Sequence, residues 1–168
     1  QVLSTLALLG ALPHRFGFDA QNLSLSDYFT AARGDAQHVA MEMTKWFDTN
    51  YHYLVPEWTA QTEFNGGSAH LFEEVEQARQ LGHRVKVSLI GPLSLLYLGK
   101  IKSGLTSPLE LLHRLLPAYQ TVLARLQQSG VEWVQIEEPI LALDLPQEYV
   151  RAFLPAYQTL QTLRPTSP

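Results

Sequence analysis

Residues 41–57 read Met-Glu-Met-Thr-Lys-Trp-Phe-Asp-Thr-Asn-Tyr-His-Tyr-Leu-Val-Pro-Glu, a dense mixture of aromatic, amide and charged side chains. Met41 to Phe47 combines methionine, threonine and aromatic residues, which predicts a short strand. Asp48 to Asn50 carries side chains that hydrogen-bond nearby backbone groups, which predicts a polar turn. Ligands of α/β proteins bind at the carboxyl ends of strands. We therefore expect either a binding site at this turn or, if the aromatic side chains only fill the core, a hydrogen-bonded corner.

Two other segments are short, apolar and followed by a proline, and we predict that both are strands. Val85 to Ile90 follows Gly82, and Val131 to Ile136 follows Gly130, so the pattern recurs after about 48 residues. Together with the segment that begins at Met41, they predict three parallel strands joined by right-handed helical crossovers. A complete barrel needs about 250 residues. The expected fold class is therefore α/β, an incomplete TIM-type (β/α) barrel of three parallel strands with flanking helices.

Apolar residues at helical spacing predict the connecting segments. The longest predicted helix opens with the capping box Ser107-Pro108-Leu109-Glu110 and extends to Gly130. Its segment Leu116-Pro-Ala-Tyr-Gln-Thr121 recurs as Leu154-Pro-Ala-Tyr-Gln-Thr159, and both prolines should bend their helices. The other predicted helices are Val2 to Leu9 before a Gly10 cap, Ser24 to Ala32, Leu71 to Leu81, Leu93 to Leu98 and a last one capped by Asp144 or a neighbour, while Gly99 to Gly104 reads as a loop.

Composition excludes several classes of protein and of site. A chain of 168 residues, 46% hydrophobic and 17% charged, can form one domain with a real core. Its net charge of −4 argues against a nucleic-acid surface. No apolar run approaches the ~20 residues that cross a bilayer, and Gln1 to Leu12 lacks a basic leader. The absence of cysteine excludes disulfides and thiolate-ligated metals and fits a cytoplasmic protein.

Residues 43–57 resemble a long and specific signature of the cobalamin-independent methionine synthase family, the 5-methyltetrahydropteroyltriglutamate–homocysteine methyltransferases. In the N-terminal barrel of that family the signature reads Met-Thr-Lys-Trp-Phe-x-Thr-Asn-Tyr-His-Tyr-x-Val-Pro-Glu, and this chain matches it nearly throughout. The similarity continues through Gly91-Pro92 and from Trp133 to Pro139, and it extends from about Val2 to Gln161. It implies that residues 1–168 are part of the N-terminal (β/α) barrel domain of a longer enzyme.

The resemblance implies transfer of the methyl group of 5-methyltetrahydropteroyltriglutamate to homocysteine, which gives methionine. In the family, a zinc ion held by His, Cys, Glu and Cys of the C-terminal barrel makes the homocysteine sulfur a thiolate at neutral pH. This chain contains neither that barrel nor cysteine, so we expect no metal, no bound cofactor and no catalytic residue in it. The isolated chain should be inactive, and its partners should be the rest of the parent enzyme and the small-molecule substrates.

Lys45 is the residue that the resemblance implies to be substrate-binding. In the family this lysine contacts the polyglutamate tail of the folate, which suits a compact cation that faces carboxylates. The residues alone favour a surface lysine or a structural ion pair, and the resemblance reverses that preference. None of the six histidines forms a His-x-His pair or the His-Glu-x-x-His pattern, so no zinc site is predicted.

Glu137 and Glu138 end the last predicted strand. Adjacent strand residues point to opposite faces, so these two carboxylates cannot both act on one substrate atom. The related enzymes carry Ile-Asp-Glu-Pro where this chain has Ile-Glu-Glu-Pro at 136–139. In the family's C-terminal barrel the equivalent aspartate contacts the pterin. In this N-terminal copy we predict a structural role for both residues.

The residues alone are also compatible with two other functions. The first is a glycosidase-like hydrolase that uses Glu42 or Glu57 with Glu137 as paired carboxylates, which would have to lie within about 10 Å of each other. The second is a non-catalytic scaffold module in which residues 41–57 only build a corner. An open sheet of barrel strands leaves two unpaired edges, so we also expect a homo-oligomer that forms through them.

Overall fold

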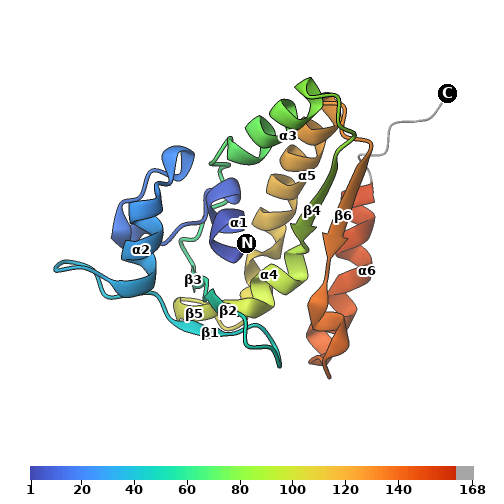
Figure 1. The fold of residues 1–168 in the computed structure, drawn as a ribbon. Helices are drawn as coiled ribbons and strands as arrows, with labels where there is room; N and C mark the ends of the chain where they lie inside the picture. The colour runs from blue at the N-terminus through green and yellow to red at the C-terminus, as the bar shows by residue number, and fades with distance from the viewer. Residues whose placement is uncertain (162–168) are drawn as a thin grey trace.

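The computed structural model of the chain describes residues 1–161, which form an α/β structure (Figure 1). The helices are α1 (Val2–Leu9), α2 (Leu25–Arg33), α3 (His70–Gln80), α4 (Pro92–Leu98), α5 (Leu112–Gln128) and α6 (Gln147–Gln161). The strands are β1 (Met43–Lys45), β2 (His52–Leu54), β3 (Glu57–Thr59), β4 (Lys86–Ile90), β5 (Lys100–Ser103) and β6 (Trp133–Glu137). Short 3₁₀ helices cover His14–Phe16, Ala20–Asn22, Pro108–Leu111 and Pro139–Ala142.

The parallel pair β4–β6 confirms two of the predicted strands, with boundaries shifted by one or two residues. Lys86 lies opposite Trp133, and Ile90 lies opposite Glu137. Figure 1 shows α5 and α6 beside this pair. Val87 and Leu89 are buried, whereas Lys86 and Ser88 on the other face of β4 are exposed. The pair therefore has one apolar face in the core and one open face.

Polar side chains form a ladder of hydrogen bonds on the open face of β4–β6. Lys86 Nζ donates to Gln135 Oε1 at 2.8 Å, and Gln135 Nε2 donates to Glu137 Oε1 at 2.9 Å. Ser88 Oγ donates to the same carboxylate oxygen at 2.5 Å. The side chains of this face thus satisfy one another.

The expectation that Met41 to Phe47 is a third parallel strand is wrong. Met43–Lys45 does form β1, but it pairs antiparallel with β2, and Lys45 lies opposite His52. The reason is the predicted polar turn, which reverses the chain so completely that the Trp46 amide donates to the Tyr51 carbonyl at 2.6 Å. Among residues 1–161 the strands form three separate pairs, β1–β2, β3–β5 and β4–β6, and no continuous sheet.

The parallel pair β3–β5 was not expected from the sequence. Glu57–Thr59 has three residues, which is too short to show an alternating pattern. Lys100–Ser103 falls in the segment predicted as a loop, because two lysines surround its single aliphatic residue, Ile101. Trp58 of β3 lies opposite Ile101 and is completely buried.

The structure confirms the predicted helices and most of the residues predicted to cap them. Gly10 ends α1 at φ 71°, a left-handed conformation that favours glycine. Ser107 and Glu110 form the predicted capping box, which opens a 3₁₀ turn before α5. The last helix begins at Gln147, where Tyr149 and Val150 amides donate to the Pro146 carbonyl.

The repeated Leu-Pro-Ala-Tyr-Gln-Thr segment has the same local structure in α5 and α6. In each copy the threonine hydroxyl donates to the carbonyl of the proline four residues earlier, at 3.0 Å in α5 and 2.9 Å in α6. In each copy the tyrosine hydroxyl reaches the end of a strand. Tyr119 donates to the Ile90 carbonyl at 2.6 Å, and Tyr157 donates to Glu138 at 2.9 Å. The repeat therefore fixes two helices to the carboxyl ends of β4 and β6.

Candidate functional site

The β1–β2 hairpin lies at the end of the molecule toward which the arrows of β4 and β6 point (Figure 1). These are the carboxyl ends of the two parallel strands, where α/β proteins bind ligands. Residues 41–57 therefore occupy the expected edge, although they form a hairpin there and not a strand of the main sheet.

The hairpin turn is held by polar and aromatic contacts of its own residues. Thr49 Oγ1 donates to the Trp46 carbonyl at 2.6 Å, and Phe47 has a positive φ of 52°, which is rare for a bulky side chain. The Trp46 ring meets Phe47 and Tyr53 edge-on, with centroids 5.3 and 5.7 Å apart. Such pairs are favourable beyond the area they bury. The turn that follows Lys45 is therefore well defined.

Two hydrogen bonds attach the hairpin and β3 to the end of α4. Tyr53 Oη donates to the Leu98 carbonyl, and Trp58 Nε1 donates to the Leu96 carbonyl, each at 3.0 Å. These carbonyls lie in the last turn of α4, where backbone acceptors lack a partner four residues on, and the Leu96 carbonyl also accepts from the Gly99 amide at 3.3 Å. Burial raises the pKa of Tyr53, and the nearby Glu42 carboxylate raises it further, so this hydroxyl keeps its donor proton.

Lys45 is exposed on β1. Within the part of the chain that the structure describes, its ammonium group makes no hydrogen bond or ion pair. Other cations near the hairpin are occupied: Lys100 pairs with Glu42 at 2.5 Å, and Arg15 pairs with Glu57 at 2.8 Å. The described residues thus give no support to a structural ion pair of Lys45, and an exposed, unpaired ammonium fits both a surface lysine and a ligand contact.

The three carboxylates of the hydrolase alternative have separate partners. Arg15 donates two N–H groups to Glu57, at 2.8 and 2.9 Å, and these two residues are 42 positions apart. Glu42 pairs with Lys100, while Glu137 accepts from the polar ladder of the open face. No hydrogen bond or ion pair among residues 1–161 brings two of these carboxylates onto one partner.

Glu137 and Glu138 point to different surroundings, as strand geometry predicts. Glu137 lies on the open face of β4–β6, whereas Glu138 reaches the first turn of α4. There its carboxylate accepts from the Ser94 amide at 2.7 Å and from the Leu93 amide at 3.2 Å. A carboxylate at a helix N-terminus satisfies free backbone donors and the helix dipole. Sequence reasoning missed this contact because it joins residues 44 and 45 positions apart.

Tyrosines buried around the helices predict a loss of stability at alkaline pH. Burial raises the pKa of four tyrosines, Tyr53, Tyr119, Tyr149 and Tyr157. The Glu138 carboxylate raises the pKa of Tyr119 and Tyr157 further. Their pKa is higher in the folded than in the unfolded chain, so their contribution is complete below pH ~10 and is lost above it. Because Tyr119 is fully buried, its titration alone should lower the folding equilibrium constant about tenfold for each pH unit above pH ~10. Urea unfolding at pH 8 and pH 11 tests this, and equal stability at both would contradict it.

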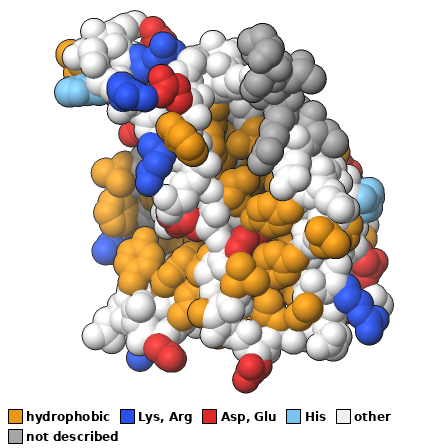
Figure 2. All heavy atoms as spheres, turned by 90° about the vertical axis from the view of Figure 1, so that its right-hand side faces the viewer, with side chains coloured by type: hydrophobic (Ala, Val, Ile, Leu, Met, Phe, Trp, Pro, Cys, Tyr) orange, Lys and Arg blue, Asp and Glu red, His pale blue; other side chains and the backbone are white. Residues whose placement is uncertain are grey.

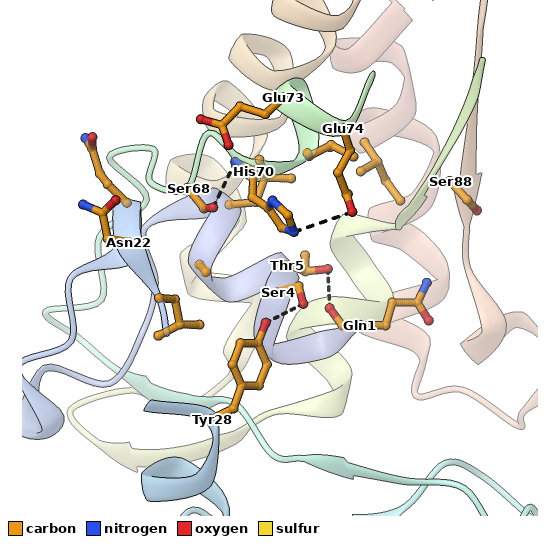
Figure 3. Close-up of a pocket in the computed structure, with 16 residues that line it drawn as sticks. Gln1, Ser4, Thr5, Asn22, Tyr28, Ser68, His70, Glu73, Glu74 and Ser88 are labelled. Carbon is orange, nitrogen blue, oxygen red and sulfur yellow. Dashed lines mark hydrogen bonds and ion pairs between the residues drawn. The ribbon is translucent and has the colours of Figure 1, made fainter. Parts of the chain in front are cut away.

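A cavity of about 490 Å³ is separate from the hairpin (Figure 3). It lies beside α1, α3 and β4. Its lining residues are joined by Ser4 to Tyr28 at 2.7 Å, Thr5 to the Gln1 carbonyl at 3.0 Å, the His70 amide to Ser68 at 3.2 Å and the His70 ring to Glu74 at 3.5 Å. No lysine or arginine lines it, and neither does any residue of 41–57. A cavity with two glutamates and no lysine or arginine is a poor match for a polycarboxylate ligand.

Two kinds of feature are absent from the part of the chain that the structure describes. Between Gln1 and Gln161, no group of three or more His, Cys, Asp or Glu side chains is placed to hold a metal ion. Over the same residues, no helix combines the length and the hydropathy required to cross a bilayer.

Comparison with known proteins gives one consistent result. Residues 1–167 match the family described as Cobalamin-independent synthase, N-terminal domain. A protein of Burkholderia thailandensis named 5-methyltetrahydropteroyltriglutamate–homocysteine methyltransferase is 62% identical over 159 residues. Proteins of the same name from Burkholderia pseudomallei and Burkholderia mallei are 60% identical over the same length. Each match covers 95% of this chain and 21% of the relative, so the chain spans about a fifth of the relatives' length. The chain therefore belongs to the cobalamin-independent synthase family and matches its N-terminal domain.

Proposed function

We propose that this chain acts as part of the N-terminal domain of a 5-methyltetrahydropteroyltriglutamate–homocysteine methyltransferase, in which Lys45 binds the polyglutamate tail of the methyl donor. The family match and the relatives' shared name support the reaction. The observation that carries the role of Lys45 is its unpaired charge on a well-defined hairpin at the carboxyl ends of the parallel strands.

The residues of this chain indicate which part of the reaction it supports and which part the rest of the parent enzyme supports. The methyl donor and a zinc ion serve the parent enzyme, and zinc there supplies a thiolate from homocysteine at neutral pH. This chain has no cysteine and no metal-binding cluster in residues 1–161, so its residues do not fit that ion. It supplies tail contacts and scaffold, and the rest of the parent enzyme supplies the metal. The isolated chain is thus expected to be inactive. Its cytoplasmic location remains a prediction.

We propose that β4 and β6 are neighbouring strands of an incomplete TIM-type (β/α) barrel within that domain. Their parallel pairing and the helix after each strand support this arrangement. The polar ladder on their open face would then line the interior of the barrel, and the free edge of β6 would pair with the next strand of the longer protein.

A chimaera tests the role of Lys45. This chain replaces the corresponding segment of the B. thailandensis methyltransferase, and steady-state kinetics are measured with Lys45 and with Lys45→Ala. Hydrogen bonds to charged groups contribute roughly 1.5–3 kcal/mol, and exposure to solvent reduces this. We expect KM for the triglutamate donor to rise about tenfold with kcat within about twofold, because a tail contact is equally strong in ground and transition states.

The matched control is Arg84→Ala, at the amino end of β4, where the side chain is 85% exposed and pairs only with Glu132 in the described residues. It removes a surface cation far from the hairpin and should leave both constants unchanged. An unchanged KM for Lys45→Ala would show that the tail does not bind at this residue.

We propose that the isolated chain self-associates through the free edge of β6. Trp133 is 70% exposed on that strand, and Val150 and Leu154 are exposed on α6. Figure 2 views this side of the molecule and shows hydrophobic side chains across its middle. Exposed strand edges beside apolar surface favour pairing with a second copy. Sedimentation velocity should show a dimer that grows with concentration and weakens in Trp133→Lys. A monomer at all concentrations would refute it.

A further inference from the structure

Glu138 connects the end of β6 to the helix on which the hairpin rests. Its carboxylate accepts three hydrogen bonds, from the Leu93 amide at 3.2 Å, the Ser94 amide at 2.7 Å and the Tyr157 hydroxyl at 2.9 Å. Two of these donors are backbone groups in the first turn of α4, and the third comes from α6. One side chain therefore joins β6, α4 and α6.

The fit around this carboxylate is close. A Cβ atom placed on Gly91, the residue before α4, would lie 2.2 Å from the Glu138 carboxyl carbon. Real Cβ atoms do not approach so closely, so the glycine leaves the space that the carboxylate fills. The amide of Gly91 in turn donates to the Glu137 carbonyl at 2.6 Å. Strand end and helix start are thus fixed against each other by both backbone and side chain.

The other end of α4 carries the hairpin. The Leu98 carbonyl accepts from Tyr53 of β2, and the Leu96 carbonyl accepts from Trp58 of β3. Between the two ends, Leu93, Ser94, Leu95 and Leu96 are completely buried, and a close-packed core transmits strain. The first turn of α4 and the carbonyls that hold Tyr53 and Trp58 are thus linked by one buried helix.

We propose that Glu138 is a positioning residue. It fixes α4 and, through the Tyr53 hydrogen bond, sets the placement of the hairpin that presents Lys45. The consequence for the triglutamate tail rests on the function proposed above for Lys45, whereas the structural coupling between Glu138 and the hairpin does not.

The adjacent Glu137 is a matched control. It has the same side chain one position earlier, but it faces the open side of β4–β6, where Ser88 and Gln135 donate to it. Glu137→Gln and Glu138→Gln remove the same charge at neighbouring positions. Only the second change weakens the acceptor at the start of α4.

Amide hydrogen exchange of the full 168-residue chain tests the coupling. In Glu138→Gln we expect the Ser94 amide and the hairpin amides of Trp46 and Val55 to exchange at least tenfold faster. Amides in the middle of α5 should change less than twofold. Glu137→Gln should leave all of them within twofold of the original chain. Tyr53→Phe should accelerate the hairpin amides but not Ser94, because it cuts the connection at the far end of α4.

Two results would overturn the proposal. The first is hairpin exchange in Glu138→Gln that equals exchange in Glu137→Gln. The second is acceleration of α5 by the same factor as the hairpin, which would mean a general loss of stability. If Glu138→Gln does not fold, Tyr157→Phe keeps the carboxylate and removes one of its donors. It should give the same pattern with about threefold changes, and a pattern confined to α6 would refute the coupling.

The chimaera separates this proposal from the function of Lys45. Glu138→Gln should raise KM for the triglutamate donor about threefold without a change in kcat. If Lys45→Ala has no effect while the exchange pattern holds, the proposed tail contact is wrong and the coupling stands. If Lys45→Ala raises KM but Glu138→Gln changes neither KM nor hairpin exchange, the positioning role is wrong.

Discussion

Trp58→Ala is expected to lower the free energy of unfolding by about 3–5 kcal/mol, the range for large aromatic residues in well-packed cores. Trp58 is completely buried, its ring lies 6.1 Å from that of Phe64, and its Nε1 donates to the Leu96 carbonyl. A Cβ on Gly99 would lie 2.0 Å from this nitrogen, so the indole fills its space closely. A chain of this size is stable by only about 5–15 kcal/mol, so the loss is a large fraction of the total.

Urea unfolding followed by circular dichroism measures this change. Trp133→Ala is the matched control, because it removes the same side chain from a site that is 70% exposed. At concentrations where the chain is monomeric, it should change stability by no more than about 0.5 kcal/mol. Equal effects of the two substitutions would contradict the packing described for β3 and α4.

Gly67→Ala is expected to be nearly as destabilising, by roughly 3 kcal/mol or more, because backbone must move to admit the new atom. A Cβ on Gly67 would lie 2.0 Å from the Ala7 carbonyl oxygen and 3.1 Å from the Gly10 nitrogen. The same carbonyl accepts a hydrogen bond from the Ser68 amide at 2.9 Å. The segment before α3 therefore packs directly on the last turn of α1.

The control for Gly67→Ala is Gly17→Ala, which can be measured by thermal unfolding in parallel. Gly17 has a positive φ of 62° and open space around the site of a new Cβ. Its substitution should therefore cost only the conformational penalty, about 1 kcal/mol. A larger effect at Gly17 than at Gly67 would show that the contact with Ala7 is looser than described.

The sequence predicts the helices well because their signals are local. Gly10 and the capping box at Ser107 mark helix ends within a few residues, and the apolar spacing of α5 extends over several turns. The strands β4 and β6 are also predicted, since each is an apolar run between a glycine and a proline. These features require no knowledge of which segments meet in space.

The strands and contacts that the sequence did not predict share a different cause. Strands β1, β2 and β3 have three residues each, so alternation cannot show whether they join the main sheet or fold back as a hairpin. The contacts of Arg15 with Glu57 and of Glu138 with α4 join distant positions and leave no local pattern. For the candidate site, the resemblance named Lys45. Its setting on an antiparallel hairpin anchored to α4 depends on contacts between distant residues, which no local sequence pattern shows.

Zero-length crosslinking tests most directly whether Lys45 meets the folate tail. In the chimaera with bound 5-methyltetrahydropteroyltriglutamate, a carbodiimide would join a tail carboxylate to a lysine amine in contact with it, and peptide mass spectrometry would locate the new amide. This chain offers four lysines, Lys45, Lys86, Lys100 and Lys102. We predict that the amide forms at Lys45 and is absent in Lys45→Ala. Crosslinking at any of the other three in place of Lys45, or at no lysine of this chain, would contradict the account.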